Sequence, residues 1–206
     1  QSGVQETLED FLNAVHADPD YSQYAGVTVT DPEINALAEK LGVPAGYVQT
    51  NVTLTEQFVF SQQLAGLPKD VADKLTFAYY VQGAADNLTP ELKAKFDTIM
   101  NNINAAVAAD FGFSAGWKSE APDSLTYTDG INAQYDQMVE DGLNEAVANG
   151  TLTEEEAASL RTLHYNPEST ATISPELKAL LTGLESNATQ TLQAKYGFSS
   201  SWTPTP

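Results

Sequence analysis

The chain of 206 residues contains no cysteine, so disulfide bonds, thiol nucleophiles and thiolate metal sites are excluded. Basic residues are scarce as well: nine lysines and arginines stand against 28 aspartates and glutamates, and the net charge is -19. Such a surface repels the phosphates of nucleic acids and the headgroups of anionic lipids. We therefore expect an acidic protein that has no nucleic-acid partner.

Long apolar stretches and metal-ligand motifs are also missing. No apolar run approaches the roughly 18–20 residues that span a bilayer, so no integral membrane segment is predicted. Residues 16–20 (His-Ala-Asp-Pro-Asp) combine one imidazole with two carboxylates, but the chain lacks the Asp-x-Asp-x-Asp-Gly spacing of a calcium loop. The sequence therefore predicts neither a metal site nor a cofactor.

The compartment is suggested by the start of the chain and by its glycosylation motifs. The chain begins Gln-Ser-Gly, without methionine and without an apolar leader, as a processed protein does. Four Asn-x-Ser/Thr sequons occur, a mild excess over chance, at Asn51, Asn87, Asn149 and Asn187. We expect a secreted, extracellular protein, and we expect any glycans at these asparagines.

What the chain does contain is an internal duplication. Residues 67–117 align without a gap on residues 152–202, at a constant offset of 85, and 15 of the 51 aligned residues are identical. Both copies contain the stretch Pro-Glu-Leu-Lys-Ala, and both end in an aromatic motif that closes at Trp117 or Trp202. Because helix boundaries and apolar positions are kept while polar positions differ, the duplication indicates two copies of one fold.

Helical periodicity dominates both copies. Apolar residues recur every three or four positions from Leu92 to Phe111, and the second copy repeats this stripe from Leu177 to Tyr196. A hydroxyl N-cap and a proline precede each stripe, and a glycine follows it. Further helices are expected at 4–15, 32–42, 54–65, 67–80, 130–148 and 152–165. Residues 26–30 alternate as a short strand would, but no obvious partner strand exists for them.

These patterns predict an all-α fold, a tandem duplication of a three-helix repeat that follows an N-terminal helical segment. The predicted boundaries are 1–50 for the N-terminal segment, 51–117 for the first repeat, 118–126 for a turn-rich linker and 127–206 for the second repeat.

No catalytic residue is predicted. The sequence Gly-Phe-Ser-Ala-Gly at 112–116 matches the pattern of a nucleophile elbow, in which a strand leads into a helix. Here a long helix leads into the motif and a polar linker follows it. We interpret Gly112 as a helix C-cap, and the aromatic residues after it as a lid on the core.

Aromatic and aliphatic residues give the main indication of function. Phe58 and Phe60, two positions apart on one helix, cannot share a narrow stripe, so this helix has a wide apolar face. Core packing explains such a face, and the alternatives are an apolar ligand site or an exposed interface. The residues predicted to line an apolar site are Phe58, Phe60, Phe77, Phe96, Phe113 and Trp117, with the counterparts Leu163, Leu181, Phe198 and Trp202.

Three functional hypotheses follow. In the first, a secreted, non-catalytic helical protein binds a lipid or another small apolar molecule. In the second, the chain is a self-assembling extracellular structural subunit of a filament, layer or matrix, because two similar halves offer two similar surfaces. In the third, which has the least in its favour, the fold assembles a pair of carboxylates into a hydrolase or other enzyme.

Overall fold

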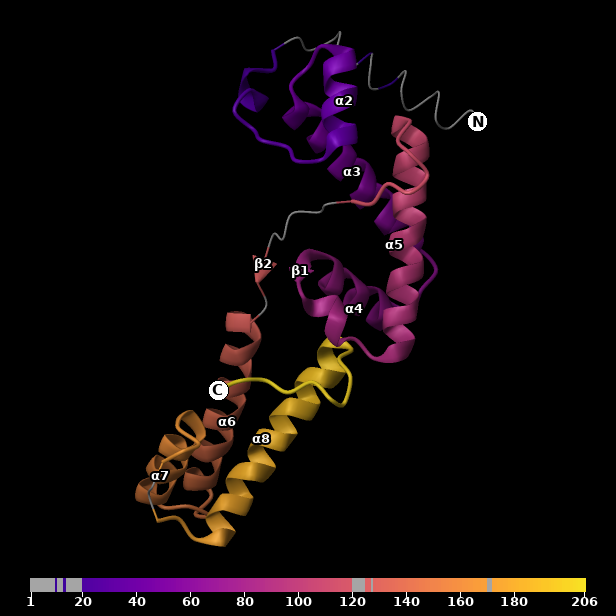
Figure 1. Ribbon diagram of the computed structural model, residues 1–206. Coiled ribbons are helices and arrows are strands. Elements are labelled where there is room, and N and C mark those ends of the chain that lie inside the picture. The colour runs from indigo at the N-terminus through magenta and orange to yellow at the C-terminus, as the bar shows by residue number, and fades with distance from the viewer. Residues whose placement is uncertain (1–9, 11–12, 14–19, 120–124, 127, 170–171) are drawn as a thin grey trace. The chain divides into compact units, whose positions relative to one another are not determined.

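The computed structural model describes residues 10, 13, 20–119, 125–126, 128–169 and 172–206. Within these residues the protein forms seven α-helices, two short 3₁₀ helices and two strands of two residues each (Figure 1). The expected all-α class is therefore confirmed.

The helices lie close to their predicted positions. They are α2 (Pro32–Leu41), α3 (Ala45–Leu64), α4 (Lys69–Tyr80), α5 (Pro90–Phe111), α6 (Thr128–Ala148), α7 (Glu154–Tyr165) and α8 (Pro175–Tyr196). The 3₁₀ helices are η1 (Ser22–Tyr24) and η2 (Ala84–Asn87), and the strands β1 (Val81–Gln82) and β2 (Leu125–Thr126) pair in parallel. The largest difference is in α3, which begins at Ala45 instead of near residue 54.

One expected strand is not formed, and one expected helix falls largely outside the described residues. Residues 26–30 form no strand, and the carbonyl of Val29 instead accepts a hydrogen bond from the Asn35 side chain at 2.8 Å. Alternating side chains alone do not make a strand when no second strand lies alongside to pair with it. The predicted helix at 4–15 lies largely outside the described residues, as does most of the stretch 16–20.

Local signals account for the helix boundaries. The Asp31 carboxylate caps α2 by accepting hydrogen bonds from the backbone of Glu33 and Ile34, and Thr153 and Glu156 form a capping box at α7. At the far end of α5, Gly112 adopts a left-handed φ of 74°. The next amide, of Phe113, then donates to the carbonyl of Ala108 at 2.8 Å, which completes a Schellman motif.

The chain divides into two compact units, Gln1–Leu67 with Ala94–Pro122 and Pro68–Lys93 with Asp123–Pro206. The division therefore falls within α5. The segments predicted from the sequence were bounded by its internal duplication and not by contacts in the fold. Their bounds, which are 1–50, 51–117, 118–126 and 127–206, stay a prediction.

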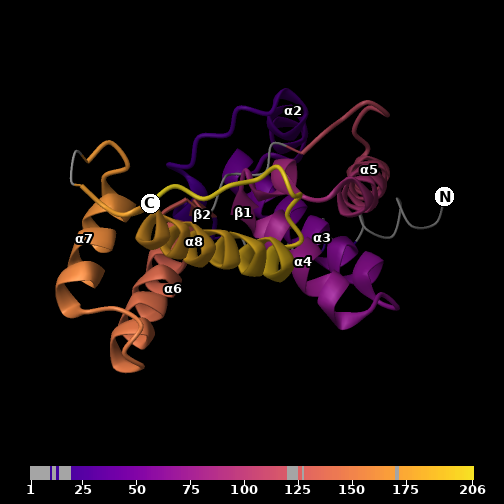
Figure 2. The ribbon, with the colours of Figure 1, turned by 90° about the horizontal axis from the view of Figure 1, so that it is seen from below.

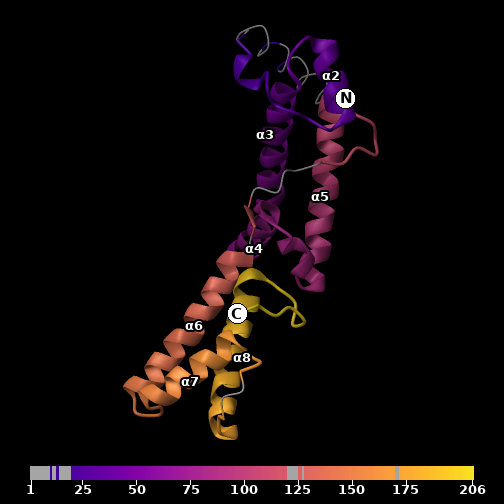
Figure 3. The ribbon, with the colours of Figure 1, turned by 60° about the vertical axis from the view of Figure 1, so that its left-hand side comes forward.

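The first unit is built on α2, α3 and most of α5. Its core residues recur at helical spacing on each helix: Ile34 and Ala38 on α2, Val48, Val52 and Phe60 on α3, and Phe96, Ile99, Ile103, Val107 and Phe111 on α5. Figure 3 shows α3 running beside α5, and the Asn102 side chain on α5 donates a hydrogen bond to Gln63 on α3 at 3.0 Å.

The second unit contains a bundle in which α6, α7 and α8 each contact the other two (Figure 2). The α6 and α8 backbones come close at Gly142, where a Cβ atom would lie 2.6 Å from the Leu184 side chain. The loop before α5 also joins the end of α8 in this unit. Thr89 donates its backbone N–H to the carbonyl of Gly197 at 2.8 Å, and Ser199 donates to the carbonyl of Asn87 at 2.7 Å.

Candidate functional site

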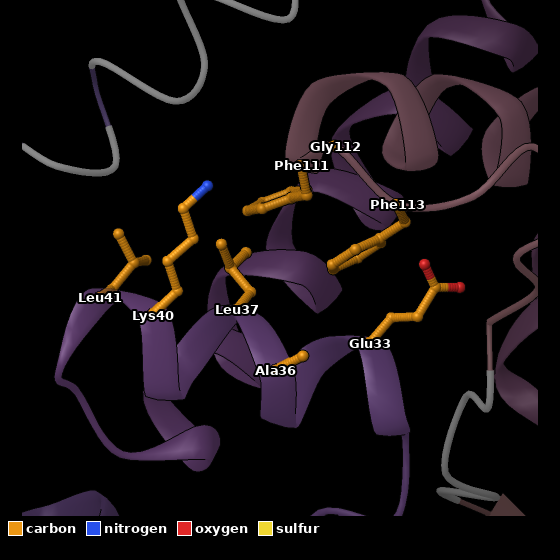
Figure 4. A pocket seen from close by; sticks show the side chains of 8 residues that line it. All are labelled: Glu33, Ala36, Leu37, Lys40, Leu41, Phe111, Gly112 and Phe113. Atoms are coloured by element: carbon orange, nitrogen blue, oxygen red, sulfur yellow. The ribbon is translucent and has the colours of Figure 1, made fainter.

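The first unit carries a groove along one side of α2. Glu33, Ala36, Leu37, Lys40 and Leu41 line it at spacings of three, one, three and one residues, which place them on a single helical face (Figure 4). The core residues Ile34 and Ala38 lie on another face of the same helix. Since α2 is apolar on two faces, one face packs into the core while the other is left to line the groove.

The opposite wall of the groove comes from the end of α5. Phe111, Gly112 and Phe113 line it, and the two phenyl rings point toward α2 (Figure 4). The rings stack with their centroids 5.8 Å apart, and the ring of Phe113 lies 5.1 Å from that of Trp117. The helix stop at Gly112 therefore sets the position of this aromatic wall.

Three hydrogen bonds fasten the segment after α5 to the start of α2. The backbone N–H and the hydroxyl of Ser114 both donate to the Glu33 carboxylate, at 2.7 and 2.8 Å. The indole Nε1–H of Trp117 donates to Oδ2 of Asp31 at 2.7 Å, while Oδ1 of the same carboxylate caps α2. These bonds hold the two walls together. They also show that Ser114, the serine of the elbow-like motif, contributes to the wall.

The groove encloses about 350 Å³ and is mostly apolar in its lining. Charge is confined to Glu33 and Lys40, which lie toward opposite ends of the α2 wall (Figure 4). This combination of an apolar body with a few placed polar groups is typical of sites for small molecules.

The predicted site residues of the first unit have different environments. Phe113 lines the groove, and Trp117 is buried directly behind it. Phe60 and Phe96 are buried in the core, whereas Phe58 is 62% exposed on α3. Thus only Phe113, supported by Trp117, contributes to this groove.

The predicted residues of the second unit form two groups. Phe77, Phe198 and Trp202 belong to an aromatic cluster, in which Phe198 lies 6.4 Å from Phe77 and 4.9 Å from Trp202 between ring centroids. Leu163 and Leu181 line a shallow, more polar pocket of about 340 Å³ together with Lys178 and Glu185. The predicted set of ten residues as a whole stays a prediction.

Most of the groove residues were missed by the sequence reasoning. Their signal was present in α2, where Ala36, Leu37 and Leu41 add an apolar face to the one formed by Ile34 and Ala38. The facing wall could not be found in this way, because the residues that join α2 to the segment after α5 are more than 80 positions apart.

A second polar cluster in the first unit is fully internal. The Glu56 carboxylate is 3% exposed and accepts the Ser119 hydroxyl at 2.8 Å, and Asp31 is 4% exposed. Burial raises the pKa of Glu56 to about 6, against the hydrogen bond from Ser119, and the negative charge of Asp31 raises it further. Both carboxylates are therefore buried, and neither lines the groove.

In the second unit a buried histidine on α7 contacts carboxyl groups on α6 and α8. His164 is 1% exposed, with Nδ1 2.7 Å from Glu185 and Nε2 2.8 Å from Asp136. Each ring nitrogen of His164 therefore has one carboxyl group as its partner, one on α6 and one on α8. Burial of the neighbouring Tyr135, together with the charges of Glu185 and Asp136, raises the pKa of its phenol.

The described residues contain neither a metal-binding cluster nor a membrane-spanning helix. No group of histidine, aspartate and glutamate side chains among them could hold a metal ion. None of the helices in the described ranges has the length and apolar character that crossing a membrane requires.

Comparison of the chain with protein-family models, curated proteins and solved structures yields no match.

The raised pKa of Glu56 predicts a specific pH dependence of stability. The folded state holds this proton more tightly than the unfolded chain does, so stability falls as pH rises from 4.5 through about 6. The gap between these pKa values corresponds to about 2 kcal/mol. Glu56→Gln lacks this titrating group. We therefore expect its free energy of unfolding, measured with urea, to rise by about 2 kcal/mol relative to that of the wild type as the pH goes from 4.5 to 7. The exposed Glu39→Gln is the control, and a Glu56→Gln difference that stays flat with pH would refute the prediction.

The contacts of His164 predict a loss of stability on removal of its ring. His164→Ala takes a hydrogen-bond partner from both Asp136 and Glu185 and leaves a cavity at a buried position, so we expect it to cost about 2–4 kcal/mol in urea unfolding. The control is Tyr165→Ala, which removes the half-exposed ring of the next residue and should cost much less. If the two variants are equally unstable, the contacts of His164 are not what makes it important.

Proposed function

We propose that this protein is a non-catalytic binding protein that takes up a small, mainly apolar molecule in the groove between α2 and the end of α5. The observation that carries the proposal is the groove itself: an apolar hollow whose two walls are fastened to each other by Asp31 and Glu33. Its volume of about 350 Å³ lies at the small end of the range of ligand sites.

Desolvation of the ligand would drive binding. Covering about 200 Å² of apolar surface yields about 5 kcal/mol, before the loss of the ligand's freedom is subtracted. Because the wall segment is already fastened in place, little ordering of the protein is needed when the ligand enters. We therefore expect dissociation constants between about 10 µM and 1 mM for simple ligands.

The proposed setting is extracellular, and the protein is proposed to be secreted. The acidic composition suits such a setting, and one sequon lies where a glycan has room. Asn149 is exposed in the turn after α6, and the Thr151 hydroxyl donates to its side-chain oxygen at 2.6 Å. By contrast, Asn51 lies within α3, where its side chain donates to the carbonyl of Tyr47 at 2.9 Å.

We also propose that the chain arose by tandem duplication of a three-helix unit. The bounds of α4 and α7 differ by 85 at both ends, and so do those of α5 and α8. Both long helices end at a glycine in the left-handed region, and the phenylalanine that follows it packs against a buried tryptophan. Equal helix lengths and equal endings are what two copies of one unit would retain.

A second candidate function, self-assembly, rests on a different surface. On α3, Leu54 is 58% and Phe58 is 62% exposed, and the two lie one turn apart on the same face. The only charged residue among the 20 of this helix is Glu56, which is buried. In a chain of net charge -19, a face without charge is where two copies meet with the least repulsion, so the proposed occupant of this face is a second copy.

The enzyme hypothesis has the least in its favour. Asp31 and Glu56 are the pair of carboxylates that such a hypothesis would use. Asp31 is held by the α2 backbone and by Trp117, and Glu56 is held by Ser119. A catalytic pair must reach its substrate, which these buried and engaged groups do not.

The binding proposal predicts that a neutral apolar probe perturbs the groove. Titration with 1-octanol, followed by amide NMR shifts, should affect residues of α2 and the segment 111–113. We expect Phe113→Ala to weaken binding about tenfold, because it removes most of one wall. The matched control is Phe58→Ala, which removes an equally large but exposed ring outside the groove and should bind as the wild type does. No saturable shift over the soluble range of 1-octanol, or equal loss in both variants, would contradict the proposal.

The self-assembly proposal predicts a weak dimer that strengthens with salt, since added ions screen the repulsion between acidic copies. Sedimentation equilibrium at several hundred micromolar should show this dimer, and Leu54→Gln combined with Phe58→Gln should abolish it. Tyr165→Ser, which removes a half-exposed ring from the other unit, serves as the control. A wild type that stays monomeric at millimolar concentration rules this surface out.

A further inference from the structure

We propose that the ligand of the groove is a medium-chain anionic amphiphile, whose acidic head pairs with Lys40 and whose chain extends along α2 toward Glu33. This inference rests on the proposed function. It concerns the two charged residues of the groove, which give an otherwise apolar site a direction (Figure 4).

Glu33 is a fixed part of the wall. Its two carboxylate oxygens accept the Ser114 backbone N–H and the Ser114 hydroxyl, at 2.7 and 2.8 Å. Both carboxylate oxygens are therefore already hydrogen-bonded within the protein, and the negative charge of Glu33 repels an anion from that end of the groove. An acidic head placed there would be opposed, whereas a terminal methyl group would meet the phenyl ring of Phe113 beside it (Figure 4).

Lys40 has the opposite character. It lies in the last turn of α2 on the exposed surface, and its stem lines the groove beside Leu37 and Leu41. Such a side chain covers apolar surface with its methylene groups while its ammonium group stays in water. Among the described residues it takes part in no ion pair, so this ammonium can meet an anion at the mouth of the groove. Lys40 also complements the negative end of the α2 dipole, a role that requires no ligand.

The distance between the two charges sets the length of the chain. Lys40 lies seven positions after Glu33 on α2, which corresponds to a rise of about 10 Å along the helix axis. An extended hydrocarbon advances about 1.3 Å per carbon, so a chain of roughly eight carbons fits this length. At physiological ionic strength, charges beyond about 8 Å are largely screened. Lys40 and Glu33 are the charged residues that line the groove, so we expect them to decide the preference despite the net charge of -19.

A matched series of three ligands tests this inference: octanoate, 1-octanol and octylammonium share one chain and differ in the charge of the head. Each is titrated into the full chain at pH 7.5 and 0.15 M salt, with amide NMR shifts of α2 as the readout. We expect octanoate to bind about three- to fivefold more tightly than 1-octanol, as an exposed ion pair allows, and octylammonium to bind no better than the alcohol. Lys40→Gln should make octanoate equal to 1-octanol, and Lys40→Glu should reverse the order.

The control is Lys118→Gln, which removes an exposed lysine from the same unit outside the groove and should leave the order unchanged. If the three ligands bind equally, or if the octanoate preference survives Lys40→Gln, the inference is overturned while the proposed function stands. If none of the three binds, both fail together. Because Lys40 is exposed, its variants should fold, and circular dichroism verifies this.

Discussion

The Asp31 carboxylate joins two parts of the first unit that are 86 residues apart. Oδ1 accepts backbone hydrogen bonds at the start of α2, and Oδ2 accepts the indole N–H of Trp117. The start of α2 and the end of the segment after α5 are thereby set by a single buried group. With Ser114 held by Glu33, the wall formed by Phe111 and Phe113 is kept opposite α2. The geometry of the groove thus depends on these contacts.

The protein carries a large excess of acid, and its buried and half-buried carboxylates have three kinds of partner. Asp31 is surrounded by N–H donors from the α2 backbone and from an indole. Glu56 has a hydroxyl for a partner, and its pKa of about 6 means that it keeps its proton more readily. Asp136 and Glu185 share one buried histidine between them. Burying a carboxylate without a hydrogen-bond partner costs folding free energy, so each of these contacts offsets the cost at its own position.

The sequence was sufficient for elements that local chemistry determines. The stripe from Leu92 to Phe111, its proline start and its glycine end lie within 25 residues of one another, and they predicted α5 closely. The strand expected at 26–30 was wrong because pairing is a tertiary property that alternation does not ensure. The aromatic residues were identified as apolar, but periodicity could not decide that Phe60 is buried, that Phe58 is exposed and that Phe113 faces a groove. Each of those outcomes depends on which other helix lies opposite.

The contact between Asp31 and Trp117 can be isolated by a double-mutant cycle, because the loss of the helix cap in Asp31→Ala cancels between the two halves of the cycle. Unfolding free energies of the wild type, Asp31→Ala, Trp117→Phe and the double variant give the coupling energy. For a hydrogen bond to a buried carboxylate we expect a coupling of about 1.5–3 kcal/mol, together with loss of 1-octanol binding in both single variants. Additive free energies, or unchanged octanol binding in Trp117→Phe, would contradict the view that this contact holds the groove together.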